Sequence, residues 1–189
     1  MNRNLSIVFS IFLLAGIIVP VYAQTGSDNV VINEVDINPP GNDASSISEW
    51  VELYNPTDSG IDIGNWKIAS TTVLKKTMTI PTGTIIEPGQ FLKYQYAKVW
   101  FTDLAECVEL RNENRIVTAK TPIPKDLLND VTSWQRIYDG YDEDCVEDAD
   151  NCDDWKFVTS TAGSSNGKLI ETQDDDEIFV TITSDKSSY

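Results

Sequence analysis

The chain has 189 residues, with 30 Asp and Glu against 14 Lys and Arg, no histidine, and a formal net charge of −16. This balance argues against a nucleic-acid-binding protein, which needs a basic surface to neutralise phosphates. Without histidine there is no Ser-His-Asp triad, no Cys-His pair and no His-ligated metal, while 41% apolar and 10% aromatic residues indicate a globular chain.

The N-terminus predicts a targeting segment. Arg3 precedes an apolar run, Leu5–Val19, and Val21-Tyr22-Ala23 places small residues where a signal peptidase reads them. The run is short for a permanent membrane helix, so we expect a signal-peptide helix over 1–23 and cleavage after Ala23, with an uncleaved anchor as the alternative. Removing Arg3 leaves 13 basic against 30 acidic residues, or −17. We expect a secreted, extracellular or cell-surface protein without a membrane span after cleavage.

Short alternating segments follow a polar leader at 24–29. Val30–Ile37 predicts a first strand, and the stretch E-W-V-E-L-Y-N-P at 49–56 predicts the central one, because its side chains alternate between two faces until Asn55-Pro56 ends it. Trp50, on the face opposite Val51, is either an exposed ligand platform or covered by a loop. The residues predicted to face the interior are Val51, Leu53, Ile61, Ile63, Trp66, Ile68, Ile85, Phe91, Val108, Leu110 and Val117.

The spacing of these strands predicts an all-β, antiparallel sandwich over residues 30–167. Strands recur every 8–12 residues or so between Gly, Pro and Asn turns, and no segment sustains a helical period. Residues 168–177 predict an acidic linker, and 178–189 a further strand. That strand either opens another Ig-like domain, in which case the sequence is a fragment, or joins the edge of the sandwich.

The three cysteines leave alternatives open. Export favours disulfides, and Cys145 with Cys152 would close a short loop, which leaves Cys107 as a reactive thiol or a buried structural residue. The pairings of Cys107 with Cys145 or with Cys152 remain alternatives.

A candidate metal site lies in the acidic stretch at 139–154, which holds nine carboxylates and no Lys or Arg. Calcium binds about six to eight oxygen ligands and accepts a flexible coordination geometry. The stretch lacks the spacing of an EF-hand loop, because Gly140 precedes the cluster, and the alternative is a solvated acidic loop. The candidate ligands for Ca²⁺ are Asp142, Asp144, Asp148, Asp150 and Asp153.

Carboxylate catalysis is the remaining enzymatic hypothesis. A glycoside hydrolase uses a pair of carboxyl groups, and Glu49 with Glu52 is the nearest pair in the central strand. Residues three apart on a strand face opposite sides, so a shared site is not expected. We therefore predict no enzymatic activity and no catalytic residues.

The order of these motifs resembles the lamin tail domain family, in particular its prokaryotic exported members. The matching stretches are 31–35, 49–56, 61–68, 80–92, 108–117, 133–136, 154–157 and 160–166. The chain departs from the family at Ala162, where proline is common, and in the length of the acidic insertion before Trp155. The end of the chain, V-T-I-T-S-D-K-S-S-Y, resembles the start of Ig-like repeats in archaeal and bacterial surface proteins.

The resemblance implies an Ig-like β-sandwich without catalytic residues, used for binding or architecture. We expect a secreted or cell-surface binding or adhesion module whose partner is a protein, a glycan or a cell-envelope component. The alternative is the N-terminal accessory domain of a larger exported hydrolase or adhesin. No nucleic-acid partner is expected, and Ca²⁺ is the one cofactor considered.

Overall fold

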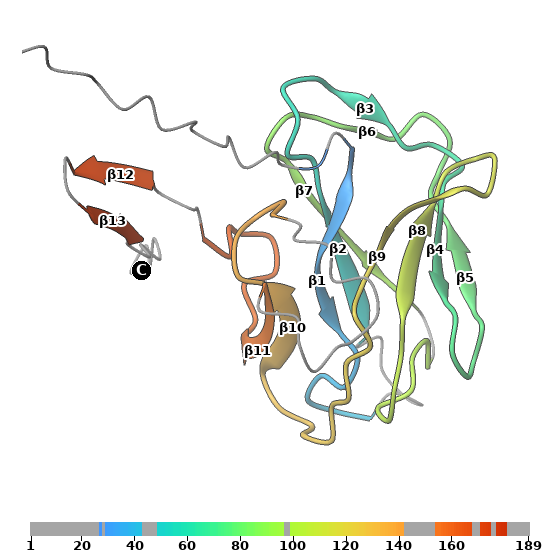
Figure 1. Cartoon of the computed structure of the whole chain (residues 1–189). Coiled ribbons are helices and arrows are strands. Elements are labelled where there is room, and N and C mark those ends of the chain that lie inside the picture. The colour runs from blue at the N-terminus through green and yellow to red at the C-terminus, as the bar shows by residue number, and fades with distance from the viewer. Residues whose placement is uncertain are drawn as a thin grey trace, which may run out of the picture.

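The structure is a computed structural model that describes residue 27 and residues 29–42, 49–96, 99–141, 154–167, 171–174 and 177–180. The predicted signal peptide, 1–23, lies outside these ranges. All regular elements in the described ranges are β-strands, in antiparallel sheets (Figure 1). The predicted all-β, Ig-like sandwich is therefore confirmed. No helix in these ranges is long and apolar enough to cross a membrane.

The larger sheet has five strands in the order β11-β10-β1-β2-β7. β1 is central because its neighbours come from both halves of the chain, β2 on one side and β10 on the other (Figure 1). Its strands are β1 (Val31–Asp36), β2 (Trp50–Tyr54), β7 (Phe91–Gln95), β10 (Thr132–Arg136) and β11 (Trp155–Thr159).

The second sheet has four strands in the order β5-β4-β8-β9 and packs against the first. A separate pair, β3 (Ile61–Asp62) with β6 (Ile85–Ile86), lies at one end of the sandwich (Figure 1). The strands of the second sheet are β4 (Lys67–Ser70), β5 (Thr77–Thr79), β8 (Val108–Arg111) and β9 (Val117–Lys120).

The core lies between the two sheets. β2 contributes Val51 and Leu53, and the turn Gly64-Asn65, with Asn65 at a φ of 66°, leads Trp66 into the same core. Ile63, Ile68, Val108 and Leu110 are also buried there, and Ile61 is half-buried against them.

Three residues predicted to face the interior do not. Ile85 is 51% exposed because, in the two-residue strand β6, its neighbour Ile86 turns inward instead. Val117 is 44% exposed because the ladder between β8 and β9 is irregular; a slip of one residue exchanges the two faces of a strand.

Phe91 is the third. Leu92 pairs with Leu53 and packs against the core, so Phe91 lies on the other face of the sheet. There its ring stacks on that of Tyr54, with the centroids 4.6 Å apart.

Beyond the sandwich, β12 (Glu171–Asp174) and β13 (Glu177–Val180) pair with each other as a separate antiparallel hairpin. β12 falls within the stretch predicted to be a linker. Figure 1 shows the hairpin apart from the two main sheets.

Candidate interaction surface

The acidic stretch that predicts a metal site is largely outside the described ranges. Asp142, Asp144, Asp148, Asp150 and Asp153 lie there, as do Cys145 and Cys152. The calcium hypothesis and this disulfide therefore stay predictions. In the described ranges no group of three or more Cys, Asp or Glu side chains is arranged to hold a metal ion.

Cys107 is a half-buried free thiol. Its Sγ donates to the main-chain oxygen of Thr121 at 3.4 Å, and burial raises the pKa of the thiol. Both features are those of a structural cysteine, since a reactive thiol needs a lowered pKa.

The carboxylates of Glu49, which precedes β2, and Glu52, on β2, do not form a shared site. Glu49 is buried and accepts hydrogen bonds from the main-chain N–H groups of Trp100 and Phe101, whereas Glu52 accepts one from Gly163. Trp50 is covered rather than a platform: its ring is buried, and the Lys93 ammonium lies 4.4 Å from the ring centroid. The two glutamates thus anchor different segments.

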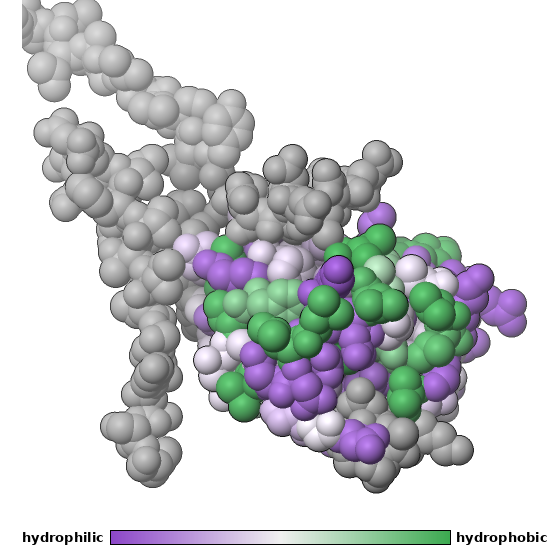
Figure 2. All heavy atoms as spheres, turned by 90° about the horizontal axis from the view of Figure 1, so that it is seen from below, coloured by the Kyte–Doolittle hydropathy of each residue, from purple (hydrophilic) through white to green (hydrophobic). Residues whose placement is uncertain are grey.

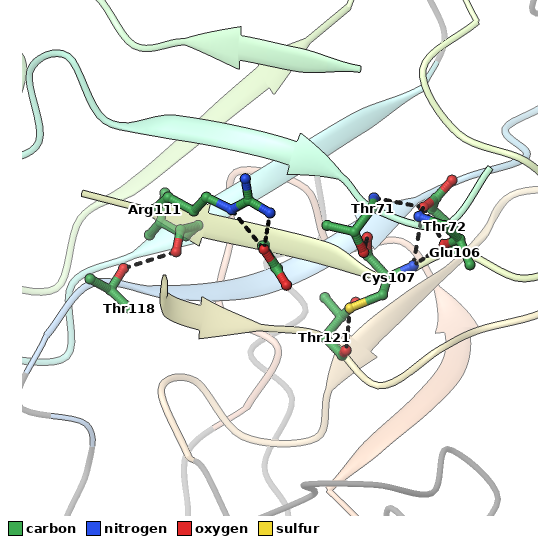
Figure 3. Close-up of polar contacts among 9 residues, drawn as sticks. Thr71, Thr72, Glu106, Cys107, Arg111, Thr118 and Thr121 are labelled. Atoms are coloured by element: carbon green, nitrogen blue, oxygen red, sulfur yellow. Dashed lines mark hydrogen bonds and ion pairs between the residues drawn. The ribbon is translucent and has the colours of Figure 1, made fainter. Parts of the chain in front are cut away.

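Three loops meet at the end of the sandwich opposite the β3–β6 pair (Figure 1): residues 71–76, 99–107 and 121–131. Glu106 joins the first loop to the second, because its Oε1 accepts from Thr71 N at 3.1 Å, Thr72 N at 3.0 Å and Cys107 N at 3.2 Å (Figure 3). The Thr72 hydroxyl adds a fourth bond at 2.5 Å. A buried carboxylate that collects four donors fixes the position of this loop.

Main-chain bonds join the second loop to the third. Asp126 N donates to Asp103 O at 2.9 Å, and Glu106 N to Pro124 O at 3.3 Å. The Nδ2 of Asn38, which follows β1, donates to Asp126 O at 3.2 Å. The three loops therefore form one connected surface rather than separate mobile tips.

This surface, which we call the loop end, exposes large aliphatic side chains. Seven of them are between 37% and 66% exposed: Val73, Leu74, Leu104, Ile123, Leu127, Leu128 and Val131. Figure 2 views the molecule from this side and shows hydrophobic residues spread over it among polar ones. Exposed apolar residues gathered on one face mark interaction sites more often than isolated ones do.

Charge at the loop end is nearly balanced, unlike that of the whole chain. Its three lysines stand against four acidic residues, of which Glu106 and Asp126 are buried; the charged residues are Lys75, Lys76, Lys125, Asp103, Glu106, Asp126 and Asp130. Near-balance lets another surface approach here with less repulsion than elsewhere on a molecule of charge −16.

Sequence reasoning missed the loop end. The pair Leu127-Leu128 between Pro124-Lys125-Asp126 and Asn129-Asp130 is the signal that points to it, because an apolar pair flanked by turn residues has no strand in which to be buried. Val73 and Leu104 are brought to the loop end by the three-dimensional fold.

Replacing Glu106 with alanine is expected to loosen the first loop. The variant should lose about 2 kcal/mol of unfolding free energy, because it removes a charged acceptor shared by several donors. Hydrogen exchange should accelerate at the amides of Thr71 and Thr72. Glu113→Ala removes the same charge from an exposed turn and is the matched control. Equal exchange rates at Thr71 and Thr72 in the two variants would show that Glu106 does not fix the position of the first loop.

Comparison with known families agrees with the fold. The model of the family described as Lamin Tail Domain matches residues 23–99, a stretch that contains β1 to β7. A search of curated proteins finds no match. The Ig-like fold of that family is typically non-catalytic.

Proposed function

We propose that this chain, whose residues 23–99 match the model of the Lamin Tail Domain family, is a secreted or cell-surface, non-catalytic binding module. Its loop end docks on an apolar surface of a partner protein. The observation that carries the proposal is the group of seven exposed aliphatic side chains on three loops, of which the second is hydrogen-bonded to the first and to the third. A rigid apolar surface loses little conformational entropy on binding.

The chemistry of the loop end favours a protein over a glycan. Its exposed large side chains are Val, Leu and Ile, whereas the aromatic residues of these loops, Trp100 and Phe101, are buried. Aliphatic side chains gain mainly from excluding water against another apolar surface. The acidic charge of the chain also opposes binding to an anionic membrane or to nucleic acid.

The proposal is tested with the mature chain carrying Leu127→Asp and Leu128→Asp together. The wild-type chain is used to capture proteins from the exported and envelope fraction of the producing cells, and the affinity of the captured protein is then measured. The double variant should bind at least about tenfold more weakly, because two charges are placed in an apolar contact.

Ile85→Asp is the control, since Ile85 is an exposed aliphatic residue outside the loop end. It should bind like the wild type. Equal loss in both variants, or binding of cell-envelope polysaccharide that neither variant affects, would contradict the proposal. Concentration-dependent dimerisation that only the double variant loses would identify the partner as a second copy of this chain.

A further inference from the structure

Two buried carboxylates face each other on the outer surface of the five-stranded sheet. Glu34 on β1 and Glu52 on β2 are directly opposite in the ladder, and both are 0% exposed. Opposed residues on antiparallel strands have Cβ atoms about 5 Å apart, and like charges in that position destabilise the pair. Removing both carboxylates from water adds to this cost.

Residues 160–167, which follow β11 and which we call the capping segment, cover this pair. Thr161 N donates to Glu34 Oε1 at 3.0 Å, and Gly163 N donates to Glu52 Oε2. Further along, Asn166 Nδ2 donates to the main-chain oxygen of Asn33 at 3.2 Å. The two carboxylates are thus acceptors that hold the capping segment on the sheet.

The hydrogen bonds around Thr161 indicate a proton on the pair. Its hydroxyl oxygen lies 3.0 Å from Glu34 Oε2, 2.8 Å from Gln135 Oε1 and 2.5 Å from Asn166 Oδ1. All three are acceptors, and a hydroxyl has one proton to give. Neither amide is readily reversed, because each NH₂ group already donates to a main-chain oxygen. A carboxyl proton supplies one of the missing donors.

The charged surroundings also favour a bound proton. The charged groups near the pair are Asp36 on β1, Asp139 after β10, Lys93 on β7 and Lys156 on β11, which pairs with Gln135 on the same face. Both lysines are exposed, whereas Asp36 is buried and Asp139 half-buried. Solvent therefore screens the cations more than the anions.

The titration of Glu52 agrees with these surroundings. Burial first, and then the nearby Glu34 and Asp139, raise the pKa of Glu52 to about 7. Its Oε1 is buried without a hydrogen-bond partner in the described ranges.

We propose that the Glu34–Glu52 pair is a proton-dependent latch for the capping segment. The pair keeps a proton while the segment is docked, and loss of that proton releases the segment and admits water to the outer face of the sheet.

The direction of the pH effect follows from where the proton is held. The docked state binds a proton that the released Glu52 carboxyl group, with its ordinary pKa of 4.5, gives up. Docking is therefore strongest in acid and weakens as the pH rises from about 4.5 to about 7. Above about pH 7 the docked pair has lost its proton, and release of the capping segment is greatest.

Hydrogen exchange of the mature chain at pH 5.5 and 8.5 tests the latch, with each rate corrected for the intrinsic exchange rate at that pH. Protection at Thr161 and Gly163 should fall about tenfold or more between the two pH values. β8, inside the core, serves as the internal reference and should stay protected.

Glu52→Gln replaces the carboxyl group with a neutral group of the same shape and should keep the capping segment protected at both pH values. Glu113→Gln removes the same charge from an exposed turn and should retain the wild-type fall. Unchanged wild-type protection, or the same fall in Glu52→Gln, would overturn the proposal. If Glu52→Gln does not fold, Glu34→Gln provides the same comparison, because its amide can donate to the Thr161 hydroxyl.

Discussion

Arg136→Ala is expected to lower the free energy of unfolding by about 4 kcal/mol, because it removes a buried guanidinium group together with its hydrogen bonds and its ion pair. Arg136 is 1% exposed on β10, and its Nε donates to Ile32 O at 2.9 Å. Another guanidinium nitrogen donates to Tyr141 O, and the group lies 4.0 Å from the buried Asp154 and 4.9 Å from the centre of the Trp155 ring. The measurement is urea unfolding of the mature chain at pH 7.

Arg111→Ala is the matched control, because it removes the same charge from a half-exposed pair with Glu109 on β8. Arg111→Ala should lower the free energy of unfolding by at most about 1 kcal/mol, since surface ion pairs contribute little to stability. Similar unfolding midpoints for the two variants would show that Arg136 does not join β10 to Tyr141 and Asp154, near the two ends of the acidic stretch.

Leu53→Ala should lower the free energy of unfolding by about 3 kcal/mol. Leu53 is fully buried on β2 between the two sheets, so the substitution removes apolar contacts and leaves a cavity that the surrounding strands fill only in part. Thermal melting should register the loss as a fall in Tm of roughly 10 °C.

Ile85→Ala provides the comparison, because the sequence pattern predicts both residues in the core and the structure leaves Ile85 half-exposed. Ile85→Ala should change the free energy of unfolding by less than about 1 kcal/mol. A large loss in Ile85→Ala with a small one in Leu53→Ala would reverse the assignment of the core.

The sequence pattern predicts the centre of the sandwich because the E-W-V-E-L-Y stretch is long enough for its alternation to be unambiguous. Val51 and Leu53 are buried as that alternation requires. The pattern fails where strands are very short or irregular: two residues at Ile85–Ile86 do not establish a phase, and the irregularity opposite β8 turns Val117 outward. Neither feature is visible in a local window of sequence.

The buried carboxylates could not be predicted either, because their partners are distant in the chain. Glu34 meets Thr161, Glu52 meets Gly163, and Glu106 meets Thr72. From composition alone these residues suggest a solvated acidic surface. In the structure they accept main-chain hydrogen bonds from loops, so part of the acidic excess is used inside the fold rather than for solubility.

This use of carboxylates connects the fold to the proposed function. The same device that docks the capping segment on one face fixes the loop end at the bottom of the sandwich in Figure 1. A loop surface held in this way presents its aliphatic side chains in one arrangement, as a binding surface requires.

The most direct test of the loop end as the binding surface is hydrogen exchange of the mature chain, free and bound to its captured partner protein. We expect protection on binding in residues 71–76, 99–107 and 121–131. Protection confined to the opposite end, at β3 and β6, or to the outer face around Trp50, would contradict it.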